Sequence, residues 1–184
     1  MEAREIFKTL SEHALKGVMF HDYMTDYFDF LNLHGYKRMS EYHAWCEMKG
    51  YRKLHSYYIN HYNKLIPDAK FEGGFVIPEK WYQFTRQDVD MNTKRSAVKD
   101  GFTKWRDWEK ETKKLYSDMY KELSELGEIA SAMKIAEYVE DVDKELKWVE
   151  RKLIELQSTD YAIDFIIDEQ QYYHEFYKKK MGDK

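Results

Sequence analysis

Apolar residues recur at alternating three- and four-residue steps along four long stretches of the chain. This spacing places the apolar side chains on one face of an α-helix and is typical of helices that bury a single face. A shorter stretch near the end of the chain has the same character. We therefore predict helices over residues 3–33, 37–66, 90–126, 129–157 and 161–179.

Glycine and proline mark the expected boundaries of these helices. Gly35 suits a tight turn after the first helix, and Gly127 suits the C-terminal end of the third. Pro67 excludes helical geometry from the residue before it, so the second helix should end there. Residues 67–89 contain both prolines and a glycine pair. A connection of that length fits the long crossover of a four-helix bundle.

Composition agrees with one all-α domain over residues 1–184. The chain has only 2 prolines and 8 glycines, which favours long uninterrupted helices over a turn-rich β architecture. Its length suffices for one domain with a sizeable core. The 16 tyrosines each combine an apolar ring with a hydroxyl group, so we expect a bulky core that carries internal hydrogen bonds.

Charge and cysteine content limit the classes of partner and the compartment. The net charge is −4 with both signs interspersed, which leaves no basic stripe for nucleic acid and no polybasic patch for a membrane surface. No stretch reaches the roughly 18 apolar residues of a membrane span, and no apolar signal segment follows the N-terminus. The single cysteine, Cys46, excludes an intrachain disulfide. We expect a cytoplasmic protein that binds neither nucleic acid nor membranes.

Four short strings of sequence, one from each long helix, resemble the ferritin-like superfamily of di-iron carboxylate four-helix bundles. They are residues 26–29 followed by Gly35, 47–54, 109–123 and 138–145. Their order and spacing carry the resemblance more than any single string does. The resemblance implies an up-down-down-up bundle with a long crossover between the second and third helices, followed here by a short fifth helix. It also implies iron held between the helices.

Proteins of this kind commonly supply one glutamate from each of two helices and a Glu-x-x-His motif from each of the other two. On this basis the resemblance makes Glu47, Glu109 and Glu145 candidate metal ligands. Glu109 lies on the apolar stripe of its helix, where a carboxylate needs a cation, a hydrogen-bond partner or a proton. The alternative is a position near solvent, or a pair with an arginine or lysine.

The remaining ligand positions depart from the family pattern. Gly50 stands three residues after Glu47, and Trp148 stands three residues after Glu145, where the family often has histidine. In the first helix the expected position falls near Ala14, with His13 as the neighbouring candidate. The resemblance therefore implies an incomplete carboxylate site, in which Trp148 could fill the space of a metal ion.

A relocated metal site is a second interpretation of the same helices. His21 lies on the inner face of the first helix, and His43 precedes Glu47 by one turn of the second. If these two helices are antiparallel neighbours, the three side chains could form a His/His/Glu cluster suited to iron or zinc. The alternative is that each histidine forms a hydrogen bond to one of the many tyrosines.

Two classes of function follow from these interpretations. The first is a non-catalytic structural or assembly protein that retains weak binding of iron or another divalent metal. The second is a protein that binds iron in order to oxidise or store Fe(II). Iron, manganese and zinc are the candidate metals, and whether the chain is an enzyme stays open. Since ferritin-like bundles commonly self-associate, the resemblance implies a homo-oligomer or a protein partner.

Overall fold

The computed structural model of the chain describes residues 2–66 and 85–182, and these residues form helices and no strand. The five α-helices are α1 (Ala3–Phe30), α2 (His34–Tyr62), α3 (Met91–Glu125), α4 (Ile129–Ser158) and α5 (Ile163–Met181). A single turn of 3-10 helix, η2 (Arg86–Asp88), precedes α3. The predicted all-α class is confirmed. Most of the predicted crossover, residues 67–84, lies outside the described residues.

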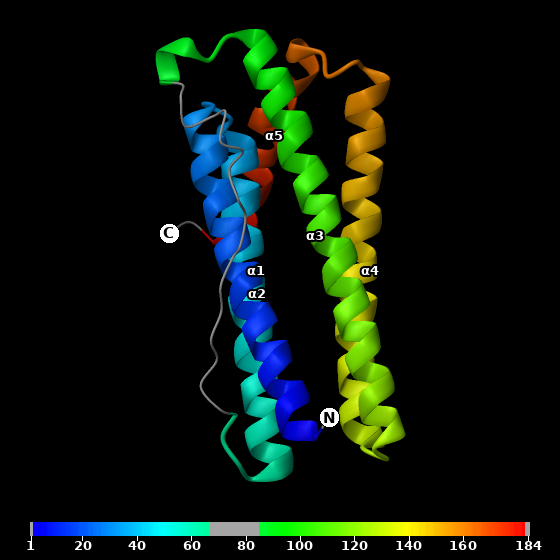
Figure 1. Cartoon of the computed structure of the whole chain (residues 1–184). Helices are drawn as coiled ribbons and strands as arrows, with labels where there is room; N and C mark the ends of the chain where they lie inside the picture. The colour runs from blue at the N-terminus through cyan, green and yellow to red at the C-terminus, as the bar shows by residue number, and fades with distance from the viewer. Residues whose placement is uncertain (1, 67–84, 183–184) are drawn as a thin grey trace.

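The four long helices form two antiparallel hairpins that lie side by side (Figure 1). Helix α1 packs mainly on α2, and α3 packs mainly on α4, while α5 packs on α2. In the view of Figure 1, α1 and α4 run upward, whereas α2 and α3 run downward.

The turn between α1 and α2 differs from the prediction. Helix α1 ends at Phe30, and Asn32 takes the left-handed conformation with a φ of 55°. Gly35, the predicted turn residue, lies in the first turn of α2. A Cβ atom on Gly35 would lie 2.4 Å from the backbone oxygen of Gln170, so the glycine is required by the close approach of α5. The Gln170 side chain accepts hydrogen bonds from the backbone N–H groups of Gly35 and Tyr36.

The other helix ends follow local chemistry. Helix α2 stops at Tyr62, four residues before the predicted end, because Asn63 adopts a φ of 52° and closes the helix. The Asp90 side chain caps α3 by accepting a hydrogen bond from the Thr93 N–H at 2.7 Å. Gly127 follows α3 with a φ of 76°, as predicted for a helix-terminating glycine.

The hydrophobic core consists of two clusters separated along the bundle axis. The first joins the C-terminal halves of α1 and α4 to the N-terminal halves of α2 and α3, and it includes Phe28, Tyr36, Phe102, Trp105 and Val149. The second joins the opposite halves and includes Phe7, Leu10, Leu54, Leu123 and Ile135. Each long helix contributes residues to both clusters. The segment between these two sets of residues carries polar side chains. These segments form a polar layer across the middle of the bundle.

A buried ion-pair network attaches α5 to the bundle. Lys152 of α4 is 4% exposed, and its ammonium group pairs with Glu155 and with Glu169 of α5. The Tyr36 hydroxyl donates a hydrogen bond to Glu169 at 2.5 Å. This arrangement links α2, α4 and α5 through Lys152 and Glu169, which are largely shielded from water, while Glu155 lies at the surface.

Replacing Lys152 with alanine should lower the free energy of unfolding by about 3–5 kcal/mol, because one half of a buried pair would remain uncompensated. Urea denaturation followed by circular dichroism measures the loss. Lys144→Ala is the matched control, since Lys144 pairs with Glu140 at the surface, and exposed pairs contribute about 1 kcal/mol or less. Equal losses in the two variants would contradict the buried network.

Candidate metal centre

The polar layer receives side chains from all four long helices. Its principal members are His13 and His21 from α1, His43 and Glu47 from α2, Glu109 and Thr112 from α3, and Glu145 from α4. Each lies between, or at the border of, segments that contribute to the two apolar clusters. Ionisable groups in such a position lose most of their contact with water, so each needs a proton, a hydrogen-bond partner or a cation.

Three of these side chains come together as a possible metal-binding triad. One ligand atom from each of His21, His43 and Glu145 lies within 4.8 Å of the others. The two imidazole rings are 5.4 Å apart between centroids. An ion about 2.1 Å from each donor needs donors no more than about 4 Å apart, so a small side-chain movement would complete the geometry. The triad combines residues from both hairpins.

His21 is the most unusual member of the triad. It is fully buried, at 0% exposure, and neither ring nitrogen forms a hydrogen bond within the described part of the chain. Burial, reinforced by the nearby His43, lowers the pKa of His21 to about 3. The ring is therefore neutral at physiological pH and keeps an unprotonated nitrogen available as a metal ligand. The rings of Phe20, His43 and Trp105 surround it and do not supply the hydrogen bond that a buried imidazole normally has.

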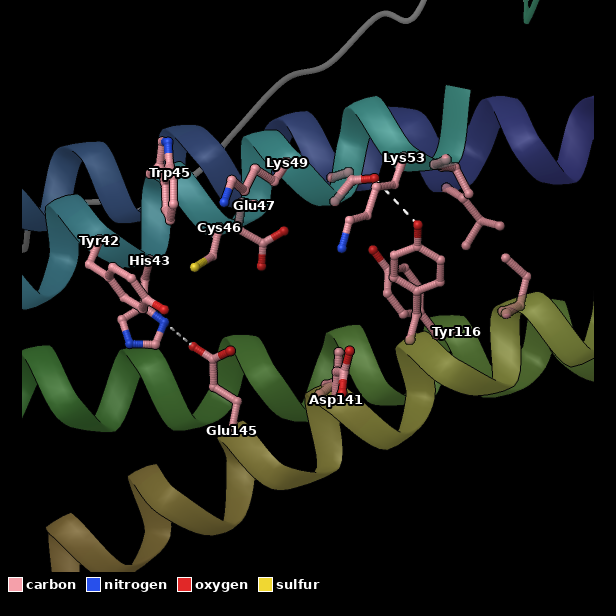
Figure 2. A pocket seen from close by; sticks show the side chains of 17 residues that line it. Tyr42, His43, Trp45, Cys46, Glu47, Lys49, Lys53, Tyr116, Asp141 and Glu145 are labelled. Atoms are coloured by element: carbon pink, nitrogen blue, oxygen red, sulfur yellow. Dashed lines mark hydrogen bonds and ion pairs between the residues drawn. The ribbon is translucent and has the colours of Figure 1, made fainter. Parts of the chain in front are cut away.

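His43 and Glu145 are already in contact across the two hairpins. The Nδ1 atom of His43 lies 2.5 Å from a carboxylate oxygen of Glu145 (Figure 2). Burial acts to raise the pKa of Glu145, but the charge and hydrogen bond of His43 outweigh it and hold the pKa below its ordinary value. Glu145 is consequently an ionised carboxylate at neutral pH. In the metal-free protein, this direct contact takes up part of the space where an ion would bind.

Glu109 lies deeper in the same layer and is 1% exposed. This burial agrees with its position on the apolar stripe. The Trp105 indole donates a hydrogen bond to its carboxyl oxygen at 3.0 Å. Burial, with the charges of Glu145 and Glu47, raises the pKa of Glu109 well above its ordinary value. The protonated form of the carboxyl is thereby favoured, and no lysine or arginine forms an ion pair with it among the described residues. Its role as a ligand stays a prediction.

Glu47 occupies a space that a glycine on α1 provides. A Cβ atom on Gly17 would lie 2.9 Å from the Glu47 carboxyl carbon and 3.0 Å from one of its oxygens, so any larger residue would displace the carboxyl group. Burial of the carboxyl, with the charge of Glu145, raises its pKa to about 8. Glu47 points into the space between α2 and the α3–α4 hairpin (Figure 2).

His13 lies elsewhere in the layer and has its own partners. Its Nε2 atom is 2.8 Å from the Thr112 hydroxyl, and its ring stacks on Trp108 with centroids 4.6 Å apart. Burial, followed by the charge of Lys16, lowers its pKa to about 4. The structure therefore does not bring His13 into the triad and instead gives it a hydrogen bond within the core.

Two positions that depart from the family pattern have different surroundings. Trp148 packs on Trp105 with ring centroids 5.3 Å apart, which places the indole beside the triad. At Gly50, the nearest atom to a Cβ built there is a ring carbon of Tyr138 at 4.0 Å. The glycine therefore lines open space instead of a tight contact.

Two cavities meet at the triad. The first, of about 370 Å³, lies between α2 and the α3–α4 hairpin and is lined by His43, Glu47 and Glu145, among others (Figure 2). The second, of about 450 Å³, lies between α2, α4 and α5 and shares His43 and Glu145 with the first. An ion at the triad would therefore have protein ligands on one side and accessible space on the other.

The sequence offered His21, His43 and Glu145 as candidates, but not as one group. The cluster expected from the sequence used Glu47 as its carboxylate, whereas Glu145 of α4 takes that place. Trp105 and Gly17 were not recognised as part of the site. A signal for Trp105 was its position one turn before Glu109 on the same helix face.

No family model, no curated protein and no solved structure matches this chain. None of the helices in the described part of the chain combines the length and apolar character that crossing a bilayer requires.

Proposed function

We propose that this protein binds one divalent transition-metal ion through His21, His43 and Glu145. The observation that carries the proposal is the buried, unpartnered imidazole of His21. A buried polar group without a partner costs about 1–3 kcal/mol, and a metal ion would supply the missing partner. His43 and Glu145 provide two further donors within 4.8 Å.

The donor set favours iron(II) or zinc. Two imidazole nitrogens and one carboxylate oxygen form the ligand set of many non-haem iron sites and of zinc sites that retain an exchangeable position. Softer thiolate-based sites are disfavoured, because Cys46 is absent from the triad. The two cavities would leave room for water or a small molecule at the remaining coordination positions. Such an ion would act as a Lewis acid, and as a redox centre if it is iron.

Metal binding should release protons. Burial raises the pKa of the Glu47 carboxyl to about 8 and the pKa of the Glu109 carboxyl well above its ordinary value, which favours their protonated forms in the metal-free protein. A divalent cation nearby favours the ionised form of every one of these groups. The protonated carboxyls thus limit the negative charge of the metal-free layer.

The helix directions support the ferritin-like resemblance as part of this proposal. Helices α1 and α4 run in one direction, and α2 and α3 run in the opposite direction (Figure 1). All four helices supply side chains to the polar layer. The ligand pattern differs, since His43 precedes Glu47 by four residues instead of following it by three. We therefore propose a ferritin-like bundle with a rearranged metal site.

A structural or assembly role without metal is the second candidate. The packing of Trp148 on Trp105 favours it, because the two indoles fill much of the space beside the triad. That role predicts an aromatic-filled centre, whereas the cavities at His43 and Glu145 leave part of it open. Metal binding is thus the better supported function.

Titration of chelator-treated protein with zinc, and with ferrous iron under anaerobic conditions, tests the proposal. We expect one equivalent to bind, as measured by calorimetry and by elemental analysis after desalting. His43→Ala and Glu145→Gln should each weaken binding by at least about 100-fold, since even outer-shell changes can reach that size. His55→Ala is the matched control, because His55 on the same helix bonds Ser11 instead. Stoichiometric binding that survives both triad variants would refute the assignment.

A further inference from the structure

The first cavity combines an apolar wall with a basic edge. Its apolar lining includes Leu10, Leu54, Ile135 and Val142, which come from three different helices. Lys49 and Lys53 also line the cavity, one helical turn apart on α2. The volume of about 370 Å³ falls within the range of small-molecule sites. A ligand that fills this space must have an apolar part for the apolar lining and a negatively charged group for the lysines.

The two lysines have no acidic partner in the described residues. The Lys49 ammonium group lies 3.4 Å from the centroid of the Trp45 ring, and neither lysine forms an ion pair there. Figure 2 shows both side chains leaving α2 beside the cavity, with Lys53 extending toward α4. Most other lysines near this surface are paired, as Lys144 is with Glu140. Lys49 and Lys53 can therefore hold an anion that enters the cavity.

Two of the acidic groups that line the cavity, Glu145 and Asp141, have basic neighbours. Glu145 is paired with His43, and the remaining acid at the cavity edge, Asp141, lies 3.4 Å from the Lys144 ammonium group. Lys49 and Lys53 are thus cavity-lining cations without an acidic partner among the described residues, and a metal ion at the triad would add positive charge beside them.

We propose that the first cavity binds a small organic carboxylate with an apolar body. Its carboxylate group pairs with Lys49 and Lys53, and its alkyl or aryl part lies on the Leu10, Leu54 and Ile135 wall. The ligand then lies beside the triad at His43 and Glu145. The inference deepens the proposed function, on which it rests for the presence of a metal ion next to the ligand.

Gly50 provides a way to close the cavity without disturbing the core. A Cβ atom there meets only Tyr138, at an ordinary contact distance of 4.0 Å. Alanine at this position therefore fits, whereas the longer side chain of leucine would extend into the cavity. Both substitutions improve helix propensity relative to glycine, so loss of binding in Gly50→Leu will not reflect loss of the helix.

Calorimetric titration of the chelator-treated protein with octanoate tests the inference. Octanol and sulfate serve as probes that lack the charge and the apolar body, respectively. We expect octanoate to bind more tightly than either. The double variant Lys49→Ala/Lys53→Ala should weaken octanoate binding by about tenfold or more, as expected for loss of a charge-assisted hydrogen bond, and leave octanol binding unchanged. Gly50→Leu should abolish binding, and Gly50→Ala should retain it.

Each alternative result has a defined meaning. Equal affinity for octanoate and octanol, or for octanoate and sulfate, would overturn the inference, as would octanoate binding that persists in Gly50→Leu. Because these titrations use metal-free protein, they do not depend on the triad. Octanoate binding without metal binding would overturn the proposed function alone, and metal binding without octanoate binding would overturn this inference alone.

Discussion

Replacing His21 with leucine should stabilise the metal-free protein and remove its response to metal. The wild-type chain buries both ring nitrogens of His21 without a hydrogen-bond partner among the described residues. Leucine has no polar atom to desolvate, so we expect the free energy of unfolding of the chelator-treated protein to rise by about 1–3 kcal/mol. Urea denaturation measures this change.

The same variant should lose stabilisation by zinc. For the wild type, free metal at 100 times its dissociation constant should add about 2.7 kcal/mol to the free energy of unfolding, and His21→Leu should gain little of this. His13→Leu is the matched control on the same helix. It removes the 2.8 Å contact with Thr112, so it should destabilise the protein and leave the metal response intact. A destabilised His21→Leu variant with a normal metal response would contradict our interpretation of the triad.

The stability of the metal-free protein should depend on pH through Glu47. Burial raises the folded-state pKa of Glu47 from 4.5 to about 8. Below pH 4.5 the carboxyl is protonated in both the folded and the unfolded state and contributes no pH dependence. Between pH 4.5 and 8 the folded state holds a proton that the unfolded state has released, so stability falls as pH rises. Above pH 8 the full penalty is present.

The Glu47→Gln variant should remove this penalty. It should match the wild type near pH 4.5 and exceed its free energy of unfolding by a few kcal/mol at pH 8.5, since each pKa unit corresponds to about 1.4 kcal/mol. Denaturation curves at a series of pH values, with chelator present, give the difference directly. Glu140→Gln, a change at an exposed position on α4, controls for the loss of one negative charge. A difference between Glu47→Gln and wild type that does not grow with pH would show that Glu47 is not held neutral in the fold.

The helices and their buried faces could be predicted from the sequence because the apolar spacing determines both. Glu109 is one example. It lies on the apolar stripe of its helix, and its side chain is 1% exposed. The turn before α2 could not be predicted in the same way. Gly35 has a glycine's freedom of conformation, but its actual role depends on Gln170 of a helix far along the chain.

The partner of His43 was also beyond the sequence pattern. Periodicity determines which face of a helix is buried, but not how far one helix is shifted along another. Each residue adds 1.5 Å of rise, so a shift of one turn exchanges one candidate ligand for the next. Glu47 is closer to His43 in sequence, yet Glu145 of the other hairpin lies in contact with it. The shift of one helix along another depends on how the two apolar clusters pack. This packing involves several helices and cannot be inferred from the sequence of one helix.

The division of the triad between the two hairpins has a mechanical consequence. His21 and His43 belong to the α1–α2 hairpin, whereas Glu145 belongs to α3–α4. An ion held by all three would fasten the two hairpins to each other at mid-length, where polar residues interrupt the apolar core. Separation of the two hairpins would then require breaking a coordinate bond between the ion and one of its protein ligands. Opening of the bundle and escape of the ion would become the same event, and the rate of one could be measured through the other.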